Sequence, residues 1–195
     1  MNYLPKGWAC ILLVTLLSSC TEPAPSGRKP NTSSQKDTGR PNTEAVRYQV
    51  LDADCGLFPS TAHIPTDDQG NDLPHRGRFT PTKPQVAHLE QALRTLPLAR
   101  VSVRTGYRIR PSYLVLIQQN LPRYKRQYFG FYNQQGQPCL YINFFPEHFV
   151  KEYPGYTPRW LLEPISVDDG GAGFWSIQYN WTTHQFYDLA HNADG

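Results

Sequence analysis

Three carboxylates near a glycine-rich turn are the side chains of this sequence best suited to acid and base chemistry. Asp168 and Asp169 directly precede Gly170 and Gly171, and Glu163 lies a few residues upstream. Two carboxylates can divide the roles of general acid and general base when their surroundings separate their pKa values. The same residues also suit an ordinary turn, because Asp favours turns and Gly supplies positive φ angles. The pattern leaves a hydrolytic site and a simple turn both open.

A basic segment without acids is the second candidate site. Between residues 100 and 126 the chain carries seven basic side chains and no Asp or Glu, with three tyrosines interleaved. Such a segment could bind anionic polymers or lipid headgroups through charge, or stack on sugar or peptide ligands. Alternatively, the charges spread over both sides of strands and pair with the acids of residues 163–194. The seven are Arg100, Arg104, Arg108, Arg110, Arg123, Lys125 and Arg126.

The histidines match no metal-binding or catalytic motif. None of the six stands in HxH or HExxH spacing, beside a cysteine, or with a GxSxG serine. The stretch from Asp67 to Asp72 is rich in oxygen ligands but lacks the spacing of an EF-hand. We therefore predict no metal and no cofactor, although residues distant in sequence could still converge.

The first 20 residues have the plan of an export signal. Lys6 precedes an apolar run from Trp8 to Leu17 that is too short to span a bilayer as a mature helix. The end of this segment, Leu17-Ser18-Ser19-Cys20, resembles the lipobox of bacterial lipoproteins. The resemblance implies cleavage before Cys20 and acylation of its sulfur and new amino group, which would anchor the protein to a membrane. The alternative is an ordinary cysteine after a conventional signal peptide or at the edge of a membrane anchor.

Three segments are expected: a signal peptide at 1–19, a lipid-anchored disordered tether at 20–45, and one domain at 46–195. The tether is rich in Pro and polar residues and has no aromatic or large aliphatic side chain with which to form a core. The remaining residues suit a single domain. Loss of Lys6 with the signal leaves 18 basic against 16 acidic residues, which is not the balance of a nucleic-acid binder.

Cys55 and Cys139 are the cysteines left after Cys10 is removed with the signal and Cys20 is acylated. Disulfides persist in exported proteins, so we predict that these two pair. The bridge would close a loop of about 85 residues, a constraint that chain-entropy theory values at on the order of 4 kcal/mol. Two buried free thiols are the alternative, because pairing requires Cα atoms within about 7 Å.

The clearest helix is expected between Thr82 and Pro97. Thr82 and Gln85 have the spacing of a capping box, and apolar residues recur on one face at Val86, Leu89, Leu93 and Leu96. Glu90 and Arg94 are expected to form an i,i+4 pair outside that stripe. A short helix is favoured over a buried strand at 113–121, with Ser112 as its cap.

The strands are expected at 46–51, in one hairpin formed by 125–133 and 138–145, at 160–167, and in a second hairpin formed by 174–181 and 185–189. Residues 52–81 are predicted to be irregular because prolines interrupt them. The predicted fold class is α+β: one small domain with an antiparallel sheet of about four to six strands and one main helix packed on it.

These patterns predict a cell-envelope lipoprotein that acts as a non-enzymatic ligand- or partner-binding module. Its expected partners are the membrane, through Cys20, and an envelope protein or anionic polymer; nucleic acid is disfavoured by the compartment. Thr21 is compatible with the outer membrane by analogy with Gram-negative lipoproteins, while the exposed face stays open. The alternatives are an envelope-polymer hydrolase that uses the carboxylates near the Asp-Gly-Gly turn, and an accessory subunit completed by a partner. The pattern from Arg126 to the last hairpin resembles small lipoproteins without a characterised function.

Overall fold

The computed structural model describes residues 42–64 and 73–192. The predicted signal peptide, Cys20, nearly all of the predicted tether and the stretch from Asp67 to Asp72 lie outside the described residues. No helix within the described ranges is long and apolar enough to cross a bilayer.

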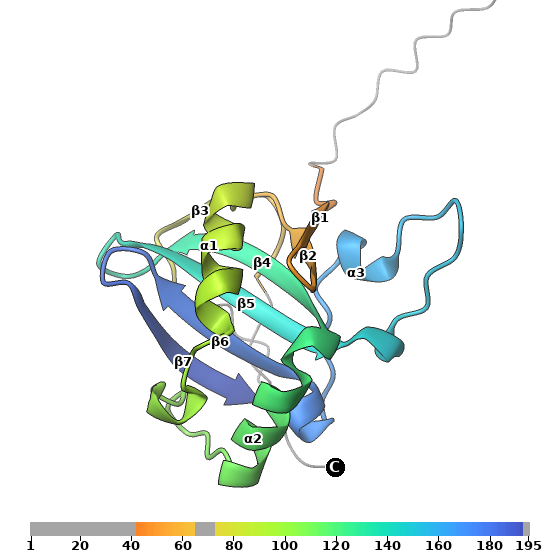
Figure 1. Ribbon diagram of the computed structural model, residues 1–195. Helices are drawn as coiled ribbons and strands as arrows, with labels where there is room; N and C mark the ends of the chain where they lie inside the picture. Colours follow the sequence, from red (N-terminus) through yellow and green to blue (C-terminus); the bar gives the residue numbers. More distant parts are fainter. Residues whose placement is uncertain (1–41, 65–72, 193–195) are drawn as a thin grey trace, which may run out of the picture. The chain divides into compact units, whose positions relative to one another are not determined.

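One sheet of seven strands organises the described chain (Figure 1). The strand order is β1-β2-β4-β5-β6-β7, and β3 pairs with β4 beside this path. Every pair is antiparallel except β2 with β4. The prediction of a mainly antiparallel sheet is confirmed, with more strands than expected. The strands are β1 (Val46–Val50), β2 (Ala53–Leu57), β3 (Gly77–Phe79), β4 (Tyr124–Tyr132), β5 (Pro138–Pro146), β6 (Trp175–Asn180) and β7 (Gln185–His191).

Both predicted hairpins are confirmed. β4 and β5 pair along their full length around a short polar loop, and β6 and β7 pair around a loop that begins at Trp181. In each hairpin β-branched and aromatic residues alternate across the sheet, so each strand contributes to both faces. The register shifts between the Ser176–Ala190 and Gln178–Tyr187 pairs, which places a bulge in the second hairpin.

The prediction that residues 52–81 are irregular was wrong at two places. β2 and β3 pair in succession with the same edge of β4, where Gly56 opposes Gln127 and Phe79 opposes Gly130. β2 ends before Pro59, and β3 lies between Pro74 and Pro81, so the prolines did not exclude two short strands. Gly130 is required for the approach of β3, because a Cβ atom there would lie 2.4 Å from the Phe79 carbonyl oxygen.

Helix α1 (Lys83–Leu93) confirms the predicted capping box. The backbone N–H of Gln85 donates to Thr82 Oγ1, and the backbone N–H of Thr82 donates to Gln85 Oε1 at 2.9 Å. Val86, Leu89 and Leu93 are buried as expected. Glu90 is buried with them, so its predicted surface pairing with Arg94 was wrong.

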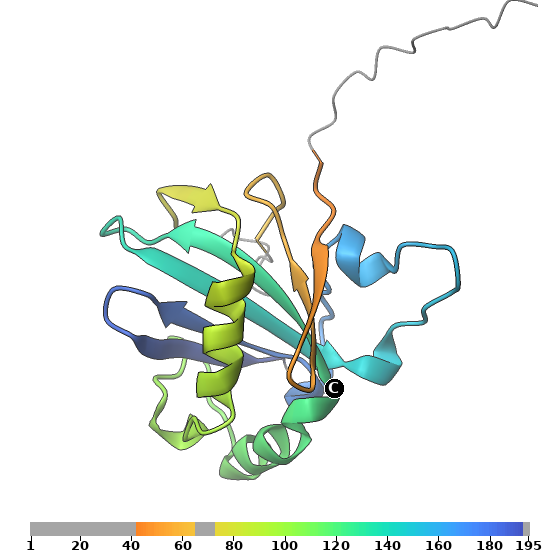
Figure 2. The ribbon, with the colours of Figure 1, turned by 45° about the horizontal axis from the view of Figure 1, so that its top comes forward.

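Helix α2 (Pro111–Asn120) confirms the helix favoured at 113–121, although it begins at Pro111 and has no side-chain cap. It is nearly as long as α1, so the prediction of one main helix is not confirmed. α1 crosses one face of the sheet, and α2 lies at one end of it (Figure 2). A short helix α3 (Arg159–Leu162) replaces the strand that was predicted at 160–167.

Apolar side chains form a core on each face of the sheet. One core lies under α1 and includes Tyr128, Ile142 and Ile177, and the other includes Phe129 and Tyr141 from the opposite face. The second core is covered by residues 58–64 and by 160–165. Ala45 is part of it, and its N–H donates to the Leu161 carbonyl at 2.7 Å. The packed domain therefore begins before residue 46.

Candidate functional site

The seven basic residues of the 100–126 segment do not form one surface. Arg126 is buried in the core under α1, where its Nε lies 2.9 Å from Glu90 Oε1 and the two side chains are 1% and 3% exposed. The Tyr128 hydroxyl donates to the same carboxylate oxygen at 2.6 Å. The two terminal guanidinium nitrogens donate to the carbonyls of Tyr124 and Leu121. Arg126 is thus a core residue and offers no charge to an external anion.

Lys125 lies on the other face of the sheet in a second ion network. Its Nζ is paired with Asp54 and, at 2.7 Å, with Glu152, and it lies 4.7 Å from the centroid of the Trp160 ring. Arg47 also pairs with both acids. Burial would raise the pKa of Glu152, but hydrogen bonds from Lys125 and Trp160 hold it below its usual value. The charge of Lys125 is therefore neutralised within the fold.

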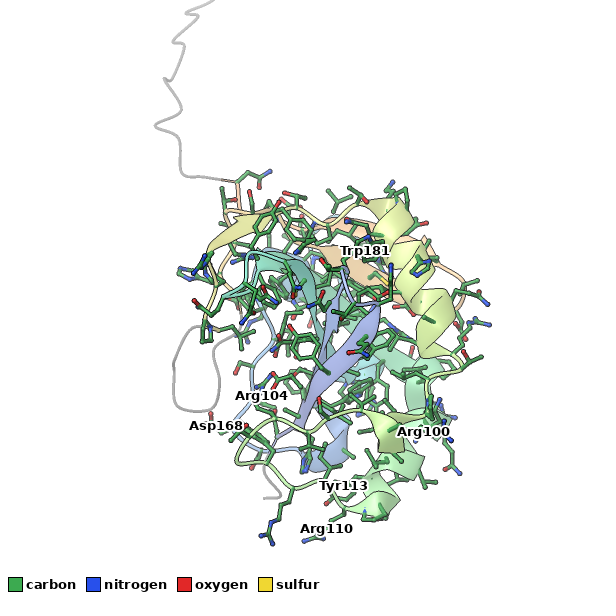
Figure 3. All side chains as sticks on the ribbon, turned by 90° about the vertical axis from the view of Figure 1, so that its left-hand side faces the viewer. Arg100, Arg104, Arg110, Tyr113, Asp168 and Trp181 are labelled. Atoms are coloured by element: carbon green, nitrogen blue, oxygen red, sulfur yellow. The ribbon has the colours of Figure 1, made fainter. Side chains whose placement is uncertain are left out.

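The other five arginines are dispersed. Arg104 pairs with Asp188 on β7, which is the pairing with late acids that the sequence left as an alternative. Arg100, Arg108, Arg110 and Arg123 are exposed. Figure 3 shows Arg104 beside β7, while Arg110 lies at the end of the molecule away from Trp181. The exposed four stay candidates for contact with an anionic polymer.

The three candidate catalytic carboxylates are solvent-exposed. Glu163 pairs with Arg159 one helical turn earlier, and the two side chains are 51% and 76% exposed. Asp168 and Asp169 are exposed before Gly170, whose φ of 123° fits a turn. Among the described residues, no group of three or more His, Cys, Asp or Glu side chains could hold a metal ion. Asp168 and Asp169 thus have the exposure and the neighbouring glycine of a turn, and Glu163 follows the end of α3.

The predicted disulfide is not formed, because Cys55 and Cys139 are both free and buried. Cys55 belongs to the core under α1, Cys139 belongs to the core on the opposite face, and β4 lies between their strands. The Cys55 thiol instead contacts Glu90 Oε1 at 3.6 Å. The disulfide prediction was wrong because the spacing of two cysteines in the sequence does not show which face of the sheet each one occupies.

An open hollow of about 660 Å³ lies over β6 and β7. It is on the sheet face opposite α1, because Gln178 and Asn180 alternate along β6 with Ile177 and Tyr179 of the core under that helix. We call it the amide hollow. Its lining consists of Leu73, Pro74, Arg104, Thr105, Phe131, Asn133, Gln134, Gln135, Gln137, Gln178, Asn180, Thr183, Gln185, Tyr187 and Asp188.

The bulge in the second hairpin positions the charged pair of the amide hollow. Asp188 has a φ of 57°, a left-handed conformation that is uncommon for a residue other than glycine. Its carboxylate accepts hydrogen bonds from Arg104 Nε at 2.9 Å and from Gln178 Nε2. The Arg104 and Asp188 side chains are 14% and 22% exposed. The two hydrogen bonds to its carboxylate fix the Asp188 side chain at the bulge.

Two loops fix the amides of the amide hollow. Asn133 Oδ1 accepts from the backbone N–H groups of Gln135 and Gln137 and closes the loop between β4 and β5. Asn180 Oδ1 accepts from the N–H groups of Thr182 and Thr183 at the start of the loop between β6 and β7. Gln137 Oε1 joins the loops, because it accepts from the side-chain amides of both asparagines at 3.0 and 2.7 Å.

Comparison with known proteins leaves the fold and the site to be interpreted from their own geometry. No protein-family model matches the chain, and the searches of curated proteins and of solved structures each returned no match.

The residues of the amide hollow were missed in the sequence, although one signal was present. Gln134, Gln135 and Gln137 were interpreted only as a hairpin loop. The alternation of β6 places Ser176, Gln178 and Asn180 on one side, and all three are buried. Buried amides require hydrogen-bond partners, so these residues mark a second, polar face of the strand. The pairing of Arg104 with Asp188 could not be predicted from the sequence, because the two residues are 84 positions apart.

Proposed function

We propose that this protein is a lipid-anchored cell-envelope protein that binds a small polar ligand in the amide hollow, without catalysis. The observation that supports binding is the amide hollow itself: its volume falls within the roughly 300–1,000 Å³ typical of small-molecule sites. Its polar groups are held by hydrogen bonds from two loops and a bulge. Such preorganisation lowers the ordering cost of binding.

The anchor part of the proposal rests on the lipobox resemblance at Cys20. It is tested by metabolic labelling with a palmitate analogue. The wild-type chain should incorporate the label and fractionate with membranes, and Cys20→Ala should lose both properties. Label that persists in Cys20→Ala would reject the anchor and leave the binding proposal unaffected.

The binding part is tested by filling the mouth of the amide hollow. Gln185 is exposed on β7, where an aromatic residue suits a strand, so Gln185→Trp adds bulk without removing a core contact. The matched control is Gln119→Trp, an exposed position on α2. The purified full chain in mild detergent is screened by thermal shift against sugars, peptides, nucleosides and amino acids.

A ligand at 100 times its dissociation constant stabilises the native state by about 2.7 kcal/mol. We expect compounds that raise the melting temperature of the wild type and of Gln119→Trp but leave that of Gln185→Trp unchanged. Hits that act equally on all three proteins, or a screen without hits, would reject the amide hollow as the binding site.

A further inference from the structure

The charged groups of the amide hollow cancel each other. Among the residues that the structure describes, Arg104 and Asp188 are the only charged side chains in its lining, and they form a hydrogen-bonded ion pair at 2.9 Å. A charged ligand would have to compete with the internal partner of whichever group it approached. The site therefore suits a ligand without net charge. A charged ligand would lose its hydration there without gaining an unpaired opposite charge in return.

The remaining polar groups offer both donors and acceptors. Asparagine and glutamine supply seven of the lining residues: Asn133, Gln134, Gln135, Gln137, Gln178, Asn180 and Gln185. Gln137 uses its Oε1 within the protein, which leaves Nε2 as a donor, whereas Gln178 uses its Nε2, which leaves Oε1 as an acceptor. Thr105 and Thr183 add hydroxyl groups. Sugar hydroxyls donate and accept at the same atom, so they suit such a mixed set.

Part of the lining is apolar. Tyr187 is half-buried and Phe131 is buried, and both line the amide hollow together with Leu73 and Pro74. An aromatic ring presents a negative face, against which the C–H groups of a pyranose pack. Burial raises the pKa of the Tyr187 hydroxyl, which keeps the ring neutral. Amides beside apolar and aromatic surface match the two kinds of surface on a sugar ring.

A peptide that extends the sheet is less well matched. The outer edge of β7 is already occupied at Leu189, whose N–H donates to the Ser102 carbonyl and whose carbonyl accepts from the Arg104 N–H, each at 2.9 Å. The polar groups available in the amide hollow are side-chain amides and hydroxyls. Strand addition instead requires a row of unpaired backbone groups.

We infer that the ligand of the amide hollow is an uncharged oligosaccharide. The inference rests on the proposed function and adds the chemical class of the ligand. The volume of about 660 Å³ and the open mouth suit a short stretch of a longer chain as well as a free oligosaccharide.

The decisive variant is Gln137→Glu. The carboxylate keeps the oxygen that accepts from Asn133 and Asn180, but it replaces the Nε2 donor with a charged acceptor. Gln119→Glu makes the same chemical change at an exposed position of α2 and serves as the control. Isothermal titration calorimetry on the full chain in mild detergent uses maltotriose, cellotriose and N-acetylchitotriose as neutral probes. Trigalacturonate, deacetylated chitotriose and an uncharged hexapeptide are the competing classes.

We expect at least one neutral trisaccharide to bind the wild type. Its affinity should fall about tenfold or more in Gln137→Glu, because a hydrogen bond is lost and a charge is buried, and stay unchanged in Gln119→Glu. Binding of only the charged sugars or the peptide, abolished by Gln185→Trp, would overturn the sugar assignment and leave the proposed function standing. Neutral sugars that bind Gln185→Trp as well as the wild type would overturn both. The absence of any neutral sugar binding would overturn this inference.

Discussion

Glu90 of helix α1 and Arg126 of strand β4 form an ion pair inside the core, with Nε 2.9 Å from Oε1. The pair links the helix to the centre of the sheet through charge rather than through apolar contact alone. Arg126 also lies with its guanidinium carbon 5.6 Å from the centroid of the Phe144 ring. Three elements of the fold therefore meet at one buried cation.

Replacement of Arg126 should destabilise the protein without affecting any surface contact. Arg126→Met leaves the Glu90 carboxylate buried and unpaired, and breaking a buried pair costs about 3–5 kcal/mol. We expect a loss of that size in the free energy of unfolding, measured by urea denaturation. Arg100→Met changes an exposed arginine and should stay within about 0.5 kcal/mol of the wild type.

The double variant Glu90→Met with Arg126→Met separates the pair from the packing. Similar-sized apolar residues can replace a buried pair at little or no cost, so the double variant should recover most of the stability lost by Arg126→Met. Losses that simply add would show that the two residues stabilise the core independently.

The stability of the protein should carry a pH dependence that Glu90 sets. Burial raises the pKa of Glu90, with Arg126 opposing the shift only in part. The folded state then binds the proton more tightly than the unfolded chain, in which a glutamate has a pKa of about 4.3. Stability from this group is present below that pH and is lost as the pH rises through the folded pKa. The free energy of unfolding of the wild type should therefore fall relative to that of Glu90→Gln as the pH is raised from 4 upward.

Urea denaturation of both proteins at several pH values measures this difference. Glu90→Gln cannot titrate, so the subtraction removes the contributions of the exposed acids, which the two proteins share. A difference that changes with pH in the opposite direction would show that the Arg126 charge outweighs burial and lowers the pKa of Glu90.

The two cysteines should behave as inaccessible free thiols. Burial raises the pKa of both Cys55 and Cys139, and the thiolate is the reactive form. We expect the native chain, cleaved and acylated at Cys20 as proposed, to react with an aromatic disulfide reagent very slowly. The same chain, once unfolded, should release two equivalents without prior reduction. Release only after reduction would demonstrate the disulfide that the structure lacks.

The extent to which the sequence predicts this fold depends on how local each signal is. The capping box at Thr82 and the alternation of β6 were sufficient to locate α1 and the last hairpin. Strand β3, with three residues, has no such signal, because its pairing depends on the close approach that Gly130 permits. The burial of Glu90 could not be predicted either, because its partner Arg126 comes from a strand distant in sequence. The same limit concealed the candidate site, where Arg104 meets Asp188 across the β7 edge.

The Arg104–Asp188 pair yields the last prediction, which concerns the charge of the amide hollow. Asp188→Asn preserves the left-handed backbone, because Asn tolerates φ values near the observed 57°, but it removes the anion that pairs with Arg104. The pair is partly exposed, so we expect a loss of about 1–3 kcal/mol in the free energy of unfolding, below the cost of breaking a fully buried pair. The released guanidinium should give the amide hollow a new affinity for trigalacturonate that weakens as salt is added. Asp169→Asn makes the same change at an exposed turn and should alter neither stability nor sugar binding. If Asp188→Asn binds charged and neutral sugars just as the wild type does, internal pairing is not what excludes anions from the amide hollow.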